Sequence, residues 1–301
     1  LAETIHSIAD VGNQFLLWVG IKVSERDADD EHPYGWGPAR YLWNLKSAMG
    51  IFFLGCGVTV WHGIHALTSG GHATEADETS QWIGIGILIA AFVLEGGSFL
   101  VAYKEVSKAK GSDVTWSEYL NEGDDPTGVG VLLEDAMAVL GVLIALVGIG
   151  LSHVLHSHYP DAIATLLIGL LLGWIAIYLA KVNGRLLIGA SISKAQIKRI
   201  RDALEADDIV EKVVDLKTEI LGQGRMRVKA EVDLYEKLMA SRMRDALKDD
   251  VDEIEGGEEA MKVLVDVVGR TVRITGHEIE RLERVIRSVA PSAIHIDLEL
   301  I

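Results

Sequence analysis

The sequence has a single cysteine and very few basic residues in its first two thirds. Cys56 is the one cysteine among 301 residues, which excludes a disulfide framework and a cysteine-ligated zinc site. Residues 1–192 contain 9 Lys and Arg against 20 Asp and Glu, whereas residues 193–301 contain 19 against 24. No basic face is available to neutralise phosphates, so the composition excludes a nucleic-acid-binding protein.

Long apolar runs occupy the region that is poor in basic residues. Apolar residues make up 49% of the chain, and the mean hydropathy is +0.26 although the net charge is −16. A bilayer-crossing helix needs roughly 20 mainly apolar residues, and five segments meet this without the polar face of a soluble helix. The predicted spans are 1–23, 41–67, 80–103, 128–152 and 160–181. The sequence therefore predicts an α-helical membrane bundle over 1–192 and a soluble domain over 193–301.

The positions of Lys and Arg predict the orientation of the spans. These residues flank the first connection and follow the third and fifth spans, whereas connections 68–79 and 153–159 contain none. By the positive-inside rule, the C-terminal domain lies on the inner side and residue 1 on the outer side. The chain starts on an apolar segment without a charged, signal-like region, so we expect a preceding first span that this sequence lacks.

Acidic residues lie within the predicted spans without basic residues at the same depth. Four polar residues of the first span share one helix face because they are spaced by three, four and three. A charge at the bilayer centre costs about 2.5 to 3.5 kcal/mol, so these groups require protons or a metal ion as partners. The residues are Glu3, His6, Asp10 and Asn13 in the first span, Glu95 in the third, and Glu134 and Asp135 in the fourth.

His6, Asp10 and Asp135 are the candidate metal ligands. The first two, at i and i+4, offer a nitrogen and a carboxylate to one ion, and Asp135 can add a ligand from another helix. Such ligands suit zinc, with manganese, iron(II), cobalt and cadmium as competitors. Because ligands lose protons when they bind metal, the same groups could exchange metal for protons. A proton relay would use the same residues. An intramembrane metalloenzyme is less favoured than a transporter or a structural subunit, because no HExxH motif accompanies these residues.

Several motifs resemble the cation diffusion facilitator family. HSIAD (6–10) and LLED (132–135) resemble its paired intramembrane motifs, and DDEHPYGWGPARY (29–41) resembles its HP-aromatic-G signature. More narrowly, EHPYG, DPTGVGVLLEDAMAVLGV and IHIDLELI resemble the mitochondrial zinc transporter nine branch. This resemblance runs from residue 1 to residue 301. It implies a homodimeric secondary transporter that moves a divalent cation, zinc first, from the inner to the outer side in exchange for protons.

The resemblance leaves the fourth ligand and the location open. Many bacterial members have His at the position of Val131 here, so Glu134 and Asn13 are the first substitutes, ahead of Glu95 or water. Glu95 and Glu3 could also relay protons. The resemblance favours the mitochondrial inner membrane, and a bacterial inner membrane fits the same charge pattern. The alternative function is a non-transporting structural or assembly subunit of a larger membrane complex.

Three further groups of residues are weaker candidates for metal sites. Asp27, Asp30 and His32 belong to an acidic loop at the inner mouth, for which a solvated loop is favoured over a cation funnel or a second metal site. His295 and Asp297 share a face of the last strand, where a solvated surface is favoured over a regulatory site. The third group lies at the outer mouth, where exposed His residues near the ends of spans are common without a metal. Its members are His153, His156, His158 and Asp161.

The soluble domain is predicted to be a small α+β, ferredoxin-like sandwich. The expected order is a helix at 194–205, strands at 209–220 and 225–234, a helix at 277–288 and a last strand from 293. LGQGR between the first two strands is a hairpin signal. An acidic, helix-leaning insertion at about 236–268 is predicted to be a flap, a partner surface or a disordered loop.

Overall fold

The computed structural model describes the chain as two compact units, Leu1–Gly189 and Ala190–Ile301. The backbone is described for residues 2–68, 78–110, 116, 119–120, 126–242 and 257–301. Side chains are described for residues 12–68, 82–110, 116, 119–120, 128–242 and 261–301.

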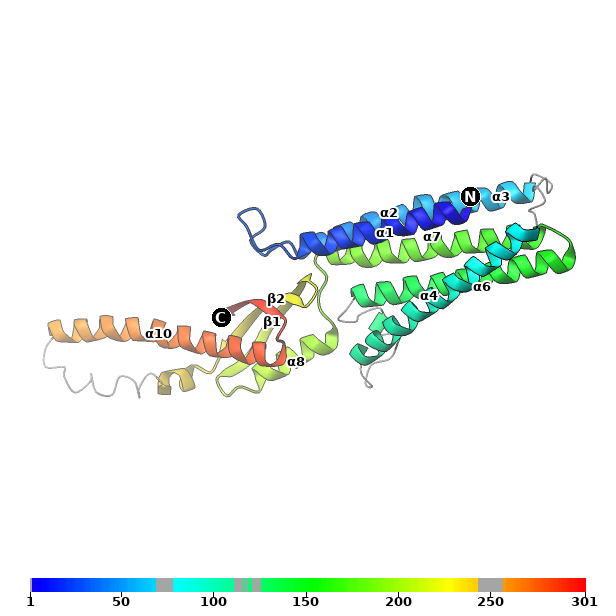
Figure 1. Ribbon diagram of the computed structural model, residues 1–301. Helices are drawn as coiled ribbons and strands as arrows, with labels where there is room; N and C mark the ends of the chain where they lie inside the picture. Colours follow the sequence, from blue (N-terminus) through cyan, green and yellow to red (C-terminus); the bar gives the residue numbers. More distant parts are fainter. Residues whose placement is uncertain (1, 69–77, 111–115, 117–118, 121–125, 243–256) are drawn as a thin grey trace. The chain divides into compact units, whose positions relative to one another are not determined.

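The first unit consists of long helices (Figure 1). Its elements are α1 (Ala2–Ser24), α2 (Ala39–Gly50), the π-helix η1 (Ile51–Gly57), α3 (Val58–Thr68), α4 (Glu78–Lys110), α6 (Pro126–Leu155) and α7 (Tyr159–Leu187). Among the described residues, four helices are long and apolar enough to cross a membrane. They are Ala39–Thr68, Trp82–Lys110, Gly128–Leu155 and Tyr159–Leu187. α2, η1 and α3 thus form one span. The backbone of α1 is helical over 23 residues, from Ala2 to Ser24, where the first span was predicted.

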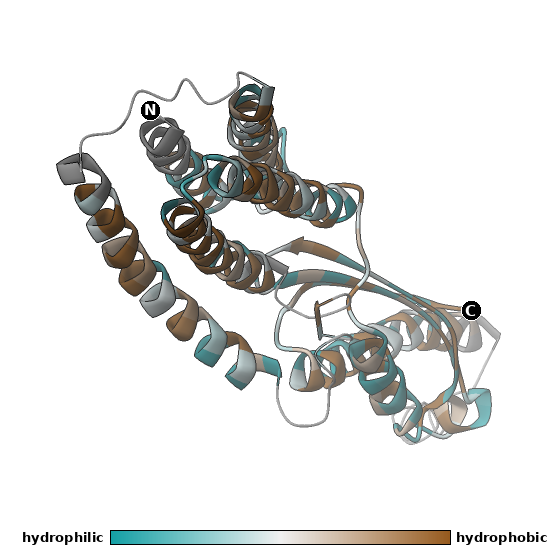
Figure 2. Ribbon diagram, turned by 90° about the vertical axis from the view of Figure 1, so that its right-hand side faces the viewer, coloured by the Kyte–Doolittle hydropathy of each residue, from teal (hydrophilic) through white to brown (hydrophobic). Residues whose placement is uncertain are grey.

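The surface of the first unit is apolar, as expected for helices that face lipid. Large apolar side chains such as Leu94, Val154 and Leu170 are more than half exposed, which water would disfavour. Figure 2 shows the apolar colouring along these helices and a mixture of polar and apolar residues along the strands of the second unit. The predicted helical membrane bundle is confirmed.

Helix α7 is the central helix of the first unit. It contacts α2, η1 and α3 on one side and α6 on another, and α4 reaches the bundle through α6. Two α7 glycines permit the first of these contacts. A Cβ on Gly169 would lie 2.7 Å from Val60 Cγ2 and 3.1 Å from Val60 N, and one on Gly173 would lie 2.8 Å from Cys56 Sγ. Small residues therefore set the distance between α7 and the second span.

We expect Gly169→Ala to destabilise the bundle. The added methyl group meets the backbone of Val60 on a helix, which cannot yield as a flexible side chain would, so we expect a loss of about 1 to 3 kcal/mol. Gly184→Ala is the matched control on the same helix, because a Cβ there meets nothing within 4 Å. Thermal unfolding in detergent measures both variants. Equal midpoints for the two would contradict this packing.

The second unit is a three-stranded sheet with helices packed against it. Its elements are α8 (Lys194–Glu205), β1 (Val210–Gly222), β2 (Arg225–Leu234), α10 (Gly257–Val289) and β3 (Ala293–Leu300). β2 is central, antiparallel to β1 and parallel to β3. Gly224 takes the positive φ of +64° that the β1–β2 turn requires. Leu204, Val228, Leu282 and Ile286 are fully buried between helices and sheet, which confirms the predicted α+β domain.

Helix α10 begins twenty residues before the predicted start at 277. Apolar residues occupy positions spaced by four and three from Met261 to Ile286, through Val265, Val268 and Val272, with Thr275 as the one polar residue in this pattern. This repeat continues the helix into what the sequence analysis treated as the insertion, so the predicted boundary was wrong. Of that insertion, 236–242 is helical and 257–268 belongs to α10, while 243–256 lies outside the described residues.

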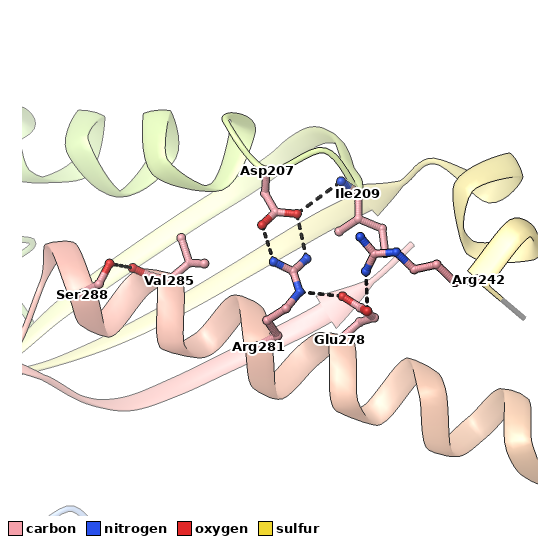
Figure 3. Close-up of polar contacts among 7 residues, drawn as sticks. All are labelled: Asp207, Ile209, Arg242, Glu278, Arg281, Val285 and Ser288. Atoms are coloured by element: carbon pink, nitrogen blue, oxygen red, sulfur yellow. Dashed lines mark hydrogen bonds and ion pairs between the residues drawn. The ribbon is translucent and has the colours of Figure 1, made fainter. Parts of the chain in front are cut away.

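An ion-pair network joins α10 to the turn after α8 (Figure 3). The Arg281 guanidinium donates to both carboxylate oxygens of Asp207 at 2.5 and 2.7 Å, and its Nε donates to Glu278 at 2.7 Å. Arg242, in the helical segment after β2, also donates to Glu278. The hydrogen bonds from Arg281 hold the pKa of Asp207 below its usual value. Three segments distant in sequence are therefore held together by charge.

Candidate metal-transport site

The paired acids of α6 point toward two different helices. Asn13 of α1 donates its side-chain amide to Glu134, and Ser98 of α4 donates its hydroxyl to Asp135 at 2.7 Å. Consecutive residues of a helix lie about 100° apart, so one acidic pair can address two neighbours at once. Asp135 and Glu134 thus link α6 to α4 and α1.

The structure describes only the backbone at the predicted first-span ligands. α1 is helical through Glu3, His6 and Asp10, so these residues and Asn13 lie along one face of that helix. The side chains of Glu3, His6 and Asp10 lie outside the described residues. Among the side chains that are described, no three His, Cys, Asp or Glu residues gather as a metal site. The structure therefore gives the helix positions of the proposed ligands but not the arrangement of their side chains around an ion.

A cavity lies beside the acidic pair, between α1, α2, α6 and α7. It has a volume of about 350 Å³, and both Asn13 and Glu134 line it. Val131, the position at which many bacterial relatives carry His, lines the same cavity. Arg40 lines it as well, from the start of α2 beside the loop after α1. Asn13 and Glu134, the first substitutes for the fourth ligand, are thus hydrogen-bonded to each other and line a cavity much larger than a bare ion.

Ser98 is a site residue that the sequence analysis missed. It lies three residues after Glu95 on α4, so both occupy one side of that helix, and Glu95 is half-buried. A serine in an apolar span attracts little notice because its hydroxyl can return to its own helix backbone. Its spacing from Glu95 is the signal that could have identified it.

The acidic loop between α1 and α2 is organised by an aromatic residue. Trp36 Nε1 donates to Asp29 at 2.8 Å, and the backbone N–H of His32 donates to the same carboxylate at 2.7 Å. The hydrogen bond from Trp36 holds the pKa of Asp29 below its usual value. The His32 ring lies against Trp36 at 3.6 Å between centroids with an interplanar angle of 31°, and its Nδ1 is 3.4 Å from Asp29 Oδ1. Asp27 and Asp30 are exposed. The loop geometry thus brings His32 to Trp36 and Asp29, and the described side chains of the loop form no group of three metal-ligating residues.

The remaining candidates are dispersed. On β3, His295 and Asp297 lie two residues apart, and Glu299 on the same face pairs with Lys229 at 2.7 Å. Near the start of α7, the backbone N–H of Asp161 donates to Ser152 Oγ at 3.1 Å. His153 and His156 are exposed at the end of α6. Within the part of the chain whose side chains are described, neither group brings three metal-ligating side chains together.

Residues 1–188 match the family described as "Cation efflux transmembrane domain". The chain belongs to the cation efflux family. It is 33% identical to the human "Proton-coupled zinc antiporter SLC30A9, mitochondrial" over 306 residues, which cover all of this chain and 53% of that protein. It is also 33% identical to "Metal tolerance protein C4" of Arabidopsis thaliana, over 99% of this chain and 66% of the relative.

A more distant relative is "Manganese efflux system protein MneP" of Bacillus subtilis. That protein is 24% identical over 70% of this chain and 66% of its own length. The chain spans about half to two thirds of the length of these relatives. Membership of the cation efflux family confirms the resemblance and, with the apolar helices, shows an integral membrane protein.

Proposed function

We propose that this cation efflux protein is a secondary transporter that exchanges a divalent cation, zinc first, for protons. The observation that carries the proposal is the cavity at α6, where Glu134 and its partner Asn13 lie next to Asp135 inside an apolar bundle. Acidic groups at that depth need a cation or protons, and a transporter uses both in turn. The names of the zinc and manganese relatives agree with this cargo.

In the proposed mechanism, His6, Asp10 and Asp135 bind the ion from the inner side. A rocking of helices then exposes the ion to the outer side, where protons displace it. Ser98 orients Asp135, and because a carboxylate has about four acceptor positions, this hydrogen bond leaves capacity for a metal. Glu134 or Asn13 supplies the fourth ligand that Val131 cannot. A shell richer in oxygen than in nitrogen also accommodates manganese.

We also propose the surroundings of the transporter. The mitochondrial relatives favour the mitochondrial inner membrane, where transport away from the C-terminal unit would remove metal from the matrix. A homodimer through the second unit is the proposed assembly. Chemical crosslinking of the full chain in membranes, read as doubled mass on gels, tests the assembly independently of transport.

Flux measurements test the proposed function. The full chain, reconstituted into liposomes that contain a pH-sensitive dye, is expected to move protons when zinc is added on one side. Asp10→Ala combined with Asp135→Ala is expected to reduce this flux to that of empty liposomes. Glu105→Ala is the control, because Glu105 is an exposed acid near the end of α4. Flux unchanged by the double variant would overturn the assignment and favour a non-transporting subunit.

A further inference from the structure

Two buried oxygens in the first unit have no hydrogen-bond partner in the described part of the chain. They are Asn13 Oδ1 and Ser47 Oγ, on residues that are 6% and 3% exposed. Both residues line the cavity of about 350 Å³. A buried acceptor left unpaired costs about 1 to 3 kcal/mol, so each oxygen calls for a donor or a cation within that space.

The orientation of two amides makes this side of the cavity a set of acceptors. Asn13 donates its NH₂ to the Glu134 carboxylate, and Asn183 donates its NH₂ to the Leu179 carbonyl at 2.8 Å. A carboxylate and a carbonyl only accept hydrogen bonds, so the NH₂ group of each amide faces its acceptor, and the amide oxygen, on the same carbon, points in a different direction. Asn183 is also buried, 6% exposed, and lines the cavity.

We propose that Asn13, Ser47 and Asn183 form a transit site for a hydrated divalent cation. Their oxygens come from α1, α2 and α7, and the cavity extends from Glu134 to Arg40 near the loop that the charge pattern places on the inner side. The site thus lies between the proposed ligands and the inner mouth. This inference rests on the proposed function, for which it supplies the step before the ion reaches Asp135.

The chemistry of the site suits brief binding. At roughly 30 Å³ for each water, the cavity has room for an ion with much of its hydration shell. Neutral amide and hydroxyl oxygens bind a hydrated ion without the attraction of a full charge, and Glu134 and Arg40 in the same lining carry opposite charges. Oxygen ligands favour hard ions such as manganese, whereas sulfur favours cadmium. Replacing the Ser47 hydroxyl with a thiol should therefore shift the preference of the site from manganese toward cadmium.

Transport kinetics with two Ser47 variants test the site. In liposomes, Ser47→Ala is expected to raise the KM for zinc and for manganese about threefold to tenfold while the maximal rate changes little. Ser47→Cys is expected to raise the KM for manganese and to lower that for cadmium. A purely structural role for Ser47 would move all three values in one direction. If the variants had the same KM values as the parent protein, or if the KM values for all three ions shifted in the same direction, the proposed transit site would be wrong.

Thiol labelling of the full chain in detergent measures binding directly. Cadmium is expected to slow the reaction of the Ser47→Cys thiol with a small methanethiosulfonate reagent at least about fivefold, and Asn183→Leu in the same protein should abolish that protection. The native Cys56 of the parent protein is the control for a lone thiol, because it is not in the cavity lining.

The two failures are distinguishable. If the parent transports zinc but cadmium gives no protection that depends on Asn183, the transit site is wrong and the proposed function stands. If cadmium protects the Ser47→Cys thiol but the parent transports no divalent cation, the cation site is supported and the proposed function is wrong.

Discussion

Asp135→Asn is expected to lower metal affinity by at least about 100-fold and to abolish proton-coupled flux. The substitution keeps the size of the side chain and a hydrogen-bond acceptor for Ser98 but removes the charge that a divalent ion needs inside an apolar bundle. It also replaces a proposed charged metal ligand with a neutral and weaker one. Isothermal titration of the purified chain with zinc measures the affinity, and liposome flux measures the coupling.

Ser98→Ala provides a graded comparison with Asp135→Asn. It removes the hydrogen bond of 2.7 Å that orients the carboxylate and leaves the carboxylate itself, so we expect a loss of zinc affinity of about 10-fold. Glu105→Gln, on an exposed part of the same helix α4, should change neither affinity nor flux. An effect of Ser98→Ala equal to that of Asp135→Asn would show that Ser98 does more than orient its partner.

Arg281→Met is expected to lower the free energy of unfolding of the second unit by about 2 to 4 kcal/mol. The variant keeps the apolar length of the side chain but leaves Asp207 and Glu278, each with 13% of its side chain exposed, without their shared cation. Arg270→Met is the control, because Arg270 forms an exposed pair with Asp266 one turn away and should contribute less than about 1 kcal/mol. Hydrogen exchange in β1 and β2 of the full chain measures both.

Acid should remove the same contribution. In the folded chain Arg281 lowers the pKa of Asp207, and for Glu278 burial raises the pKa but hydrogen bonds from Arg281 and Arg242 outweigh it and lower it. Depressed carboxyl pKa values stabilise the fold above the unfolded values, about 3.9 and 4.3, and this stability is lost as the pH falls through the lower folded values. Protection from exchange in the parent should therefore fall below about pH 4, and Arg281→Met should show less of that fall. Identical pH profiles for the two proteins would contradict the network.

The elements of the fold could be predicted well where one physical signal dominates. The apolar runs of the last four spans and the alternation of RMRVKAEVDL each have a single reading, and the structure contains helices and a strand there. The start of α10 was predicted too late because Thr275 interrupts its apolar repeat and Gly269 and Gly276 are poor helix formers; in the structure both glycines lie in open space on the helix. A helix packed against a sheet over half its length tolerates such residues in the other half.

The candidate site could be predicted only as a list of residue types. Spacing placed Asn13 on the face of His6 and Asp10, but it could not show that the Asn13 amide donates to Glu134 or that Asp135 points to Ser98. These pairings depend on how α6 is rotated between its neighbours, which the apolar side chains of three helices decide together. Ser47 and Asn183 were missed for the same reason, since a single polar residue in a span is often satisfied by its own helix.

The central claim is that a divalent ion binds between α1 and α6. The most direct test is electron cryo-microscopy of the full chain with zinc, supported by elemental analysis of the same sample. We expect metal density bounded by His6, Asp10 and Asp135, and its absence from the Asp10→Ala, Asp135→Ala protein. Density confined to the 25–38 loop or to the soluble unit, with none between α1 and α6, would contradict the claim.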